Sequence, residues 1–238
     1  MSNKKYEFVD GDTIEHNGIT LKRIRANVAI GLTVSAGDLG GYIQSEENLS
    51  RMDDSWVFGN ASVSGDARVS GNAWVSGDAR VSGDAWVFGD ARVFDDAWVS
   101  DNARVSDNAW VFGDAHVYDS AWVSGNSRVS GDAWVFGNSR VSDNAWVFGN
   151  SRVSGDAHVS GDALVKNDKS IFWATKVGNN NDTLTAFKNK DGKITLVHGC
   201  FVGSISRFKA LLEEKHSERT KREYKLLIKV AKSRILGE

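Results

Sequence analysis

Residues 73–90 read AWVSGD-ARVSGD-AWVFGD, three copies of a six-residue unit that the chain repeats nineteen times between Ser55 and Asp168. Valine occupies the third place of every unit, from Val57 to Val165. Because six is a multiple of two, a β-strand keeps each place of the unit on one side of the chain. Alanine and valine then point inward, their neighbours point outward, and the Gly-Asp or Gly-Asn pair turns a corner. The period predicts a solenoid and excludes a helix.

An aliphatic residue followed four places later by a small residue, as in Val75 and Ala79, resembles the hexapeptide repeat of left-handed parallel β-helices. The resemblance implies three hexads per triangular coil and a left-handed coil. Nineteen hexads then give a little over six coils, in a rod of roughly 30 Å at about 4.8 Å per coil. We expect an all-β solenoid: a left-handed parallel β-helix of about six triangular coils with an N-terminal β cap and a small C-terminal α+β module.

The outward place before each valine alternates between tryptophan and a cation, so each type recurs every twelve residues. With eighteen residues per coil, one step along the rod exchanges tryptophan for a cation on nearly every face. The expected ladders are Arg68-Trp86-Arg104-Trp122-Arg140-His158, Arg80-Trp98-His116-Trp134-Arg152 and Trp74-Arg92-Trp110-Arg128-Trp146. Each guanidinium would lie against indoles in the coils above and below, in cation–π contacts of about 0.5–1 kcal/mol.

The third ladder is the candidate binding surface, because most outward phenylalanines fall beside it. Its aromatic members are Trp56, Phe58, Trp74, Phe94, Trp110, Phe112, Trp146 and Phe148, and its stacking cations are Arg92 and Arg128. Tryptophan and arginine are enriched at protein–protein hot spots, so this face is expected to bind a second copy of the chain or another protein. The alternative is that the ladders only cover and stiffen the rod.

The segments that flank the repeats predict caps, which solenoids need to close their cores. Residues 1–54 are expected to form a hairpin around Asn17-Gly18 and, at residues 37–43, an irregular first coil. Residues 55–168 form the β-helix, and residues 169–238 form a basic α+β module. The expected elements of that module are strands at 171–177, 183–187 and 193–197 and helices from Ser204 to about Lys215 and from Ser217 to about Ile235.

Charge is divided unevenly along the chain. Residues 1–54 carry a net charge of −3, residues 55–165 carry −7 and residues 166–238 carry +8, within a total of −2. An acidic rod with a basic terminal module predicts head-to-tail packing or an acidic partner. Nucleic acid is not expected, because no recognition motif accompanies the basic module. Neither a membrane-spanning stretch nor a signal sequence is expected, and the single cysteine, Cys200, fits a reducing compartment.

Two further stretches resemble known proteins. Gly40-Gly41-Tyr42-Ile43 and Ser55-Trp56-Val57 resemble the opening of uncharacterised bacterial and phage hexapeptide-repeat proteins. Residues 172–175, 182–187 and 199–203 resemble a small module that ends many phage- and prophage-encoded repeat proteins. The resemblance implies a mobile-element origin, and with it a place in the cytoplasm of a host bacterial cell or on a virion. It transfers no catalytic residue.

Three classes of function are open. The expected one is a non-catalytic structural or interaction protein for self-assembly or partner binding, of which inhibition of a host factor is one form; it needs no cofactor. The second is an acyltransferase, which the resemblance to left-handed β-helix enzymes suggests. Those enzymes use an inserted loop and a general-base histidine, whereas here no hexad carries an insertion and His116 and His158 fill arginine slots. The third is ice binding, which needs flat threonine arrays rather than charged guanidiniums.

Two smaller patterns have chemical interpretations. Stacked corner aspartates, Asp78, Asp96, Asp114 and Asp132, offer the oxygen ligands that calcium prefers. The glycine-rich nonapeptide calcium motif is absent, so a solvated acidic edge without a metal is expected. His198 lies two residues before Cys200, and a Cys–His nucleophile is conceivable. Residues spaced by two share a strand face without any catalytic role, and no catalytic residue is expected.

Overall fold

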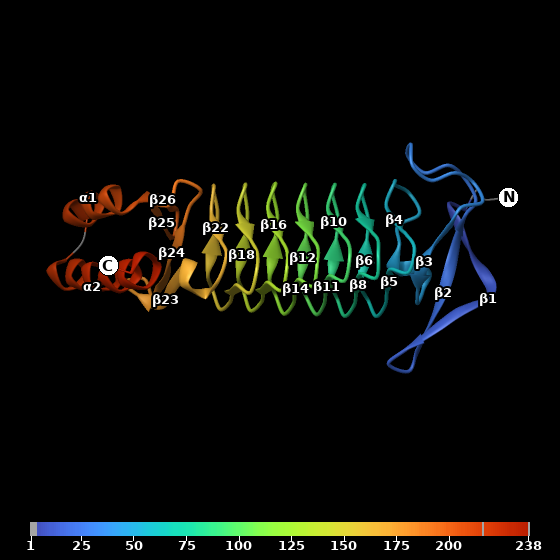
Figure 1. Ribbon diagram of the computed structural model, residues 1–238, viewed down its shortest axis with the longest axis horizontal. Helices are drawn as coiled ribbons and strands as arrows, with labels where there is room; N and C mark the ends of the chain where they lie inside the picture. The colour runs from blue at the N-terminus through green and yellow to red at the C-terminus, as the bar shows by residue number, and fades with distance from the viewer. Residues whose placement is uncertain (1–3, 216, 238) are drawn as a thin grey trace.

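The computed structural model describes residues 4–215 and 217–237, and the chain forms a rod (Figure 1). The repeats build the shaft. The N-terminal strands close one end, and a C-terminal sheet with two helices closes the other. The parallel β-helix with two caps that the sequence predicts is therefore confirmed.

Each hexad contributes one short strand, made of the outward residue and the valine that follows it. Strands three hexads apart pair in parallel, so residue i lies beside residue i+18. Arg92, for example, pairs with Trp74 on one side and Trp110 on the other. This register confirms three hexads per coil, and it produces three faces that run along the rod.

The three faces are named here by their strand counts. The nine-stranded face holds β1 (Tyr6–His16), β2 (Ile19–Ala26), β3 (Leu39–Ile43), β5 (Ser62–Val63), β8 (Arg80–Val81), β11 (Trp98–Val99), β14 (His116–Val117), β17 (Trp134–Val135) and β20 (Arg152–Val153). The six-stranded face holds β6 (Arg68–Val69), β9 (Trp86–Val87), β12 (Arg104–Val105), β15 (Trp122–Val123), β18 (Arg140–Val141) and β21 (His158–Val159). The seven-stranded face holds β4 (Trp56–Val57), β7 (Trp74–Val75), β10 (Arg92–Val93), β13 (Trp110–Val111), β16 (Arg128–Val129), β19 (Trp146–Val147) and β22 (Leu164–Val165).

The shaft has about seven coils. The nineteen hexads supply a little over six of them, as expected, and give the seven strands of the seven-stranded face. The remainder comes from the irregular coil expected at residues 37–43, which adds one position to each of the other two faces. There β3 pairs in parallel with β5, and Leu49 forms a parallel bridge with Val69. This coil lacks the hexapeptide pattern, so counting hexads underestimates the length of the rod.

Small side chains fill the interior. The valines and alanines of the hexads are at most 2% exposed. Serine takes the alanine place at three buried positions of the later coils, where its hydroxyl donates a hydrogen bond to a backbone carbonyl. The donor–acceptor pairs are Ser127 to Ser124 at 2.7 Å, Ser139 to Val153 at 3.4 Å and Ser151 to Phe148 at 2.9 Å. These bonds offset the cost of burying a hydroxyl.

The first residue of each two-residue corner has a positive φ. These residues recur at every sixth position from Gly59 to Gly161. Glycine fills most of these positions, but aspartate fills five of them. Each of these aspartates accepts a hydrogen bond from the backbone N–H of the matching corner in the next coil. The pairs are Asp95 with Gly113, Asp101 with Asp119, Asp107 with Gly125, Asp119 with Gly137 and Asp143 with Gly161, at 2.9–3.4 Å. The bond offsets a left-handed backbone that costs about 1–2 kcal/mol without glycine.

The N-terminal cap continues the lattice of the shaft. The expected hairpin is confirmed: β1 and β2 pair antiparallel around Asn17 (φ 51°) and Gly18 (φ 77°). Strand β2 then pairs with β3, which carries the cap into the nine-stranded face. A short 3₁₀ helix, η1 (Glu46–Asn48), follows. The side-chain amide of Asn48 donates to the carbonyls of Gly65 and Ala67, both at 2.9 Å, which fixes this turn on the first regular coil.

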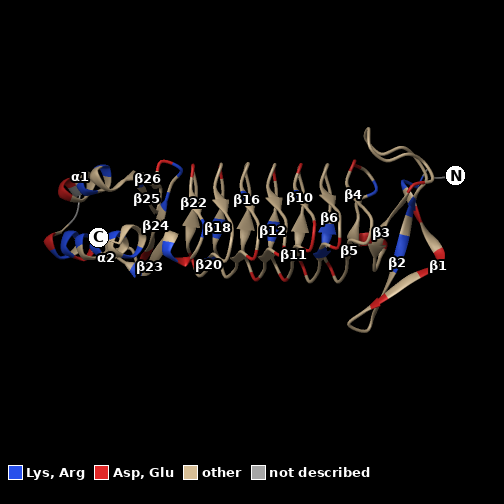
Figure 2. Ribbon diagram, viewed as in Figure 1, with Lys and Arg blue, Asp and Glu red and all other residues tan. Residues whose placement is uncertain are grey.

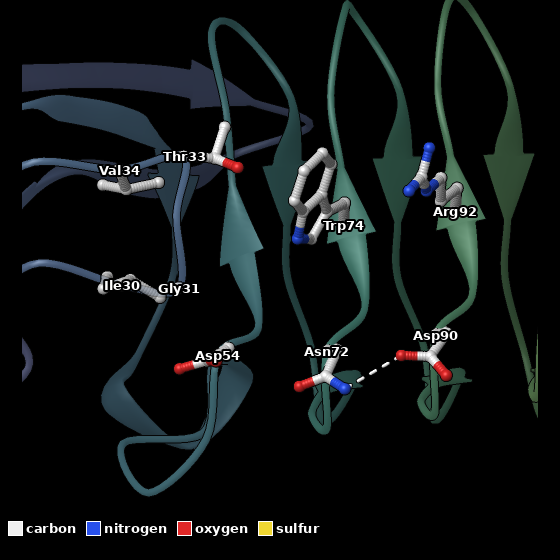
Figure 3. Close-up of a pocket in the computed structure, with 9 residues that line it drawn as sticks. All are labelled: Ile30, Gly31, Thr33, Val34, Asp54, Asn72, Trp74, Asp90 and Arg92. Carbon is white, nitrogen blue, oxygen red and sulfur yellow. Dashed lines mark hydrogen bonds between the residues drawn. The ribbon is translucent and has the colours of Figure 1, made fainter.

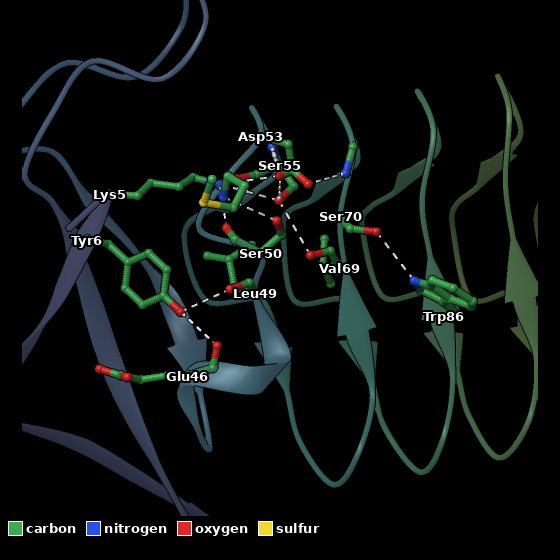
Figure 4. A network of polar contacts seen from close by, with 12 residues as sticks. Lys5, Tyr6, Glu46, Leu49, Ser50, Asp53, Ser55, Val69, Ser70 and Trp86 are labelled. Atoms are coloured by element: carbon green, nitrogen blue, oxygen red, sulfur yellow. Dashed lines mark hydrogen bonds and ion pairs between the residues drawn. The ribbon is translucent and has the colours of Figure 1, made fainter. Parts of the chain in front are cut away.

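A buried lysine anchors the start of β1 to the loop that precedes the first hexad (Figure 4). Lys5 is 5% exposed, and its Nζ donates to the carbonyl oxygens of Ser50 at 2.8 Å and Ser55 at 2.6 Å. Asp53 lies 3.7 Å from the same nitrogen. Burial lowers the pKa of Lys5 to about 8, against the opposing pull of Asp53. The neighbouring Tyr6 hydroxyl donates to the carbonyl of Leu49 at 3.1 Å.

The Gly40-Gly41 pair lets β3 lie close to the first coil. A Cβ on Gly40 would lie 2.5 Å from Ile24 Cγ1 and 2.8 Å from the Trp56 ring. A Cβ on Gly41 would meet the Ala61 carbonyl and lie 2.6 Å from Val57 Cγ1. Any side chain at these two positions would therefore push the cap away from the shaft.

The C-terminal module is a four-stranded antiparallel sheet with two helices, joined to the shaft by the 3₁₀ turn η2 (Asp168–Ser170). Its elements are β23 (Ile171–Val177), β24 (Asp182–Lys188), β25 (Ile194–His198), β26 (Phe201–Ser204), α1 (Ile205–Lys215) and α2 (Glu218–Leu236). The three expected strands and both expected helices are confirmed within a residue or two. Strand β26 was not expected, because it is short and contains a glycine.

The C-terminal sheet has two buried faces. Ile171, Phe187 and Val197 join the core of the shaft, while Leu184 and Leu196 join a second core with both helices. Two bonds fasten the sheet to the last coil: the backbone N–H of His158 donates to Thr185 Oγ1, and that of Lys190 donates to the Asp162 carbonyl, both at 3.0 Å. The sheet therefore seals the open end of the shaft.

Candidate interaction surface

The three outward ladders have the composition that the period predicts. Every ladder pair lies in strand register, from Arg68 beside Trp86 to Arg140 beside His158. The ladder side chains of adjacent coils, however, do not form one uniform stack, and their contacts differ from place to place. They depend on the second outward residue of each hexad, the serine, phenylalanine or tyrosine that follows the valine.

Each ladder tryptophan contacts the residue sixteen positions earlier, which lies in the preceding coil. Where that residue is serine, the indole Nε1 donates to its hydroxyl. The pairs are Trp86 with Ser70, Trp98 with Ser82, Trp122 with Ser106 and Trp146 with Ser130, at 3.0–3.3 Å. Where it is aromatic, the two rings meet edge to face. The pairs are Phe58 with Trp74, Phe94 with Trp110 and Tyr118 with Trp134, at 5.3–6.0 Å between centroids. All seven indoles are thus held in place.

Among the ladder residues, most cation–π contacts lie on the seven-stranded face. Arg92 lies between two indoles, 4.9 Å from the Trp74 ring and 5.3 Å from the Trp110 ring. Arg128 lies 5.6 Å from the Trp110 ring. On the other faces, Arg140 lies 5.9 Å from Trp122 and Arg152 lies 5.6 Å from Trp134. The expectation of indoles above and below every arginine therefore holds only for Arg92.

The seven-stranded face contains all the residues of the predicted aromatic surface, but they differ in accessibility. Trp56 is 1% exposed, because the N-terminal hairpin covers it and Tyr6 packs edge to face on its ring at 6.2 Å. Placing Trp56 on the outward surface was therefore wrong. The phenylalanines, with Trp74 and Trp110, are half-buried against their neighbours. Phe94 and Phe112 stack face to face at 4.8 Å.

The most exposed indoles lie elsewhere. Trp86 and Trp122 of the six-stranded face and Trp98 and Trp134 of the nine-stranded face are 37–43% exposed, as is Trp146 of the seven-stranded face. These indoles project further because most of them rest on a small serine rather than on an aromatic ring. The sixteen-residue offset could have indicated this difference from sequence.

A loop of the N-terminal cap reaches over the start of the seven-stranded face (Figure 3). Its bridged residues Ile30 and Val34 line a recess of about 280 Å³ together with Trp74, Arg92 and Asp90. Leu32, at the tip of this loop, is fully exposed. A fully exposed leucine in this loop is an apolar contact point that the repeat pattern alone does not predict.

The two shaft histidines occupy arginine places in their ladders, as expected. His116 lies between Trp98 and Trp134, with ring centroids 5.7 and 5.2 Å apart. His158 is partly buried, and its Nε2 lies 3.3 Å from Ser142 Oγ. Burial and the nearby Arg140 guanidinium lower the pKa of His158. Both imidazoles are part of the ladder packing.

The two C-terminal residues considered for catalysis, His198 and Cys200, have different surroundings. Cys200 is exposed, whereas the His198 imidazole faces the module core and its Nε2 lies 2.6 Å from the Tyr224 hydroxyl. Burial raises the pKa of Tyr224 to about 12. In residues 4–215 and 217–237, no group of three or more His, Cys, Asp or Glu side chains is arranged to hold a metal ion.

Charge is distributed along the rod as the sequence indicates. Lysine and arginine gather on the C-terminal helices, while acidic residues mark the corners of the coils (Figure 2). In the described part of the chain, neither helix is long and apolar enough to cross a membrane.

The repeats match a known family. The sequence pattern described as "YdcK Beta solenoid repeat" matches residues 61–77, 73–89 and 97–112. The chain is a β-solenoid repeat protein. The matched segments lie in the first half of the shaft, and the pattern describes its coils rather than either cap. No match was found among curated proteins.

Proposed function

We propose that this β-solenoid protein is a non-catalytic structural or interaction protein that binds through its side. The supporting observation is that non-repeat modules close both ends of the shaft, each with residues that complete the shaft core. Closed ends prevent one shaft from extending another by strand pairing. The Trp/Arg ladders along the side are then the regular surface that a partner protein or a second copy meets.

The ladders suit such binding because their side chains are already ordered. Every ladder indole is fixed by a serine or an aromatic ring of the preceding coil. Ordered aromatic side chains lose little conformational entropy when a partner covers them. The β-helix lattice holds them at regular intervals along the shaft.

The seven-stranded face is the proposed contact surface. It combines the Arg92 guanidinium between two indoles, the Phe94–Phe112 stack and the recess that Trp74 and Arg92 line. The resemblance to phage and prophage repeat proteins supports a setting in a host bacterial cell or on a virion. In that setting, binding and inhibiting a host factor is one form of the proposed function.

The test compares two matched pairs of aromatic residues. Phe94→Ser with Phe112→Ser removes the stacked pair of the proposed face, and Tyr118→Ser with Phe136→Ser removes an equivalent stack, at 5.0 Å, from the nine-stranded face. Serine is native to this place in many hexads, so both double variants should fold.

Sedimentation velocity over a range of concentrations measures self-association, and capture from a host lysate measures partner binding. We expect the Phe94/Phe112 variant to lose the complex and the Tyr118/Phe136 variant to keep it. A wild-type protein that stays monomeric and captures nothing would refute the proposed function. Equal complex formation by both variants would refute the choice of face.

A further inference from the structure

A recess lies where the shaft meets the C-terminal module, away from the proposed contact surface. Its volume is about 350 Å³, within the range of about 300–1,000 Å³ typical of small-molecule sites. Four parts of the chain form it: the last coils of the nine-stranded face, η2, the start of β23, and the last turn of α2. Phe136, Arg152, Phe172, Trp173 and Arg234 are the lining residues that matter for the argument.

Three of the eight residues that line this recess are aromatic, and their rings are held in place. Phe136 stacks face to face on Tyr118, with centroids 5.0 Å apart and planes within 1°. Trp173 packs against the shaft core, and Phe172 packs against the core of the module. Because these rings are supported from different sides, they leave a slot between the shaft and the module that a flat apolar group can enter.

Two guanidiniums supply the polar groups of the recess. Arg152 extends from β20 and lies 5.6 Å from the Trp134 ring, and Arg234 extends from the last turn of α2. Neither forms an ion pair with an acidic side chain in residues 4–215 and 217–237. The carboxylate that also lines the recess, Asp168, accepts the backbone N–H of Arg152 at 2.9 Å. The formal charge of the lining is therefore +1.

We infer that this recess binds a small aromatic anion, a flat ring that carries a carboxylate or a phosphate. The ring would pack among Phe136, Phe172 and Trp173, and the anionic group would accept hydrogen bonds from Arg152 and Arg234. Arginine suits this role because its planar fork pairs with carboxylate and phosphate oxygens and remains charged at any physiological pH. The site uses no residue of the seven-stranded face, so it does not depend on the proposed function.

Calorimetric titration with phenyl phosphate and with benzoate tests the inference on the full-length protein. Both probes should bind saturably at millimolar concentration or below, and the tighter one identifies the preferred anionic group. Inorganic phosphate and benzyl alcohol each lack one half of the ligand and should bind at least tenfold more weakly, as expected when a charge-assisted contact or a buried ring is lost.

Two matched pairs of variants locate the site. Arg234→Gln should weaken binding of the probe about tenfold, whereas Lys229→Gln removes an exposed cation from the same helix and should have no effect. Phe136→Ser should weaken binding, whereas Phe88→Ser, in the same place of a distant hexad, should not. Circular dichroism confirms that each variant is folded.

Three results would overturn the inference. The first is the absence of saturable binding by either aromatic probe. The second is binding that Arg234→Gln and Phe136→Ser leave unchanged. The third is inorganic phosphate binding as tightly as phenyl phosphate, because the aromatic walls would then contribute nothing.

Discussion

The two ends of the rod are closed in different ways. At the N-terminal end, β2, β3 and β5 follow one another in a single face of the shaft, and Tyr6 and Ile24 belong to the same core as the valine column. At the C-terminal end, a separate sheet seals the shaft with one face and carries its own core on the other. We infer that the N-terminal cap unfolds together with the shaft, whereas the C-terminal helices can be lost while the shaft stays closed.

The largest expected effect comes from placing a side chain where β3 of the N-terminal cap lies against the first coil. Gly41→Val should lower the free energy of unfolding by about 3 kcal/mol or more, because the new side chain would occupy the space of Val57 and of the Ala61 carbonyl. Urea unfolding followed by tryptophan fluorescence measures this loss. Since the cap and the shaft share a core, the shaft signal should change in the same transition.

Gly37→Ala is the control for this substitution. Gly37 lies in the same cap with a φ of 95°, and a Cβ there meets no atom within 4 Å. It should cost about 1–2 kcal/mol through backbone strain alone. Equal losses in the two variants would show that the close approach of β3 to the shaft is not what holds this cap.

The second effect tests the independence of the C-terminal helices. A Cβ on Gly178 would overlap the Tyr224 hydroxyl and lie 2.9 Å from its Cζ. Gly178→Ala should therefore cost about 2–3 kcal/mol, through this overlap and the positive φ of 66°. Hydrogen exchange should show faster exchange in α2 and unchanged protection in the shaft.

Tyr224→Phe sharpens the same comparison. Removing the hydroxyl should relieve part of the overlap, so the Gly178→Ala substitution should cost less in this background than in the wild type. Loss of protection in the shaft amides would contradict the view that the two cores unfold separately.

The third effect is a pH dependence confined to the N-terminal cap. Folding lowers the pKa of Lys5 to about 8, so between that pH and the ordinary pKa of 10.5 the unfolded chain binds more protons than the folded one. The free energy of unfolding should therefore rise with pH in this window, and the penalty for burying the charged amine is fully present below pH 8.

Urea unfolding between about pH 8 and 9, where unfolded tyrosines with a pKa near 10 remain mostly protonated, measures this slope. Lys5→Met should abolish it. Lys4→Met, which removes a half-exposed lysine next in the chain, should leave it intact. A slope that survives Lys5→Met would assign the pH dependence to another group.

The smallest expected effect concerns the corner aspartates of the shaft, which lie outside both caps. Asp143→Ala should lower the free energy of unfolding by about 1 kcal/mol, because it loses the bond to Gly161 and keeps the left-handed backbone. Asp143→Asn keeps the acceptor and should be nearly neutral. Asp143→Gly loses the bond but relieves the strain, so it should lie between the two. A larger loss for glycine than for alanine would refute this account.

Much of the fold was predictable because the repeat is a local code. The inward Ala and Val columns, the three ladders and the i to i+18 register all follow from the six-residue period, and the structure confirms them. The caps were less predictable. The hairpin at Asn17-Gly18 follows from turn chemistry, but the position of β3 against the first coil depends on Gly40 and Gly41 meeting residues far along the chain.

The candidate surface was likewise predictable only where it follows the repeat. Its ladder residues were identified by spacing, but the burial of Trp56 depends on Tyr6, fifty residues earlier in the chain. The exposed Leu32 and the recess beside Trp74 depend on how the cap loop folds back. The recess between Phe136 and Arg234 joins residues nearly one hundred positions apart. Spacing within a hexad carries no information about such contacts.

The sequence by itself determined the shaft: its period sets the coil, the inward columns and the alternation of indoles and guanidiniums, since each follows from strand geometry repeated at constant spacing. Only the tertiary structure decided which of those indoles remain accessible, why one lysine is buried and where shaft and module leave a recess. These features arise where non-repeating segments pack onto the repeat, and such packing depends on shape and desolvation between residues that are distant in sequence.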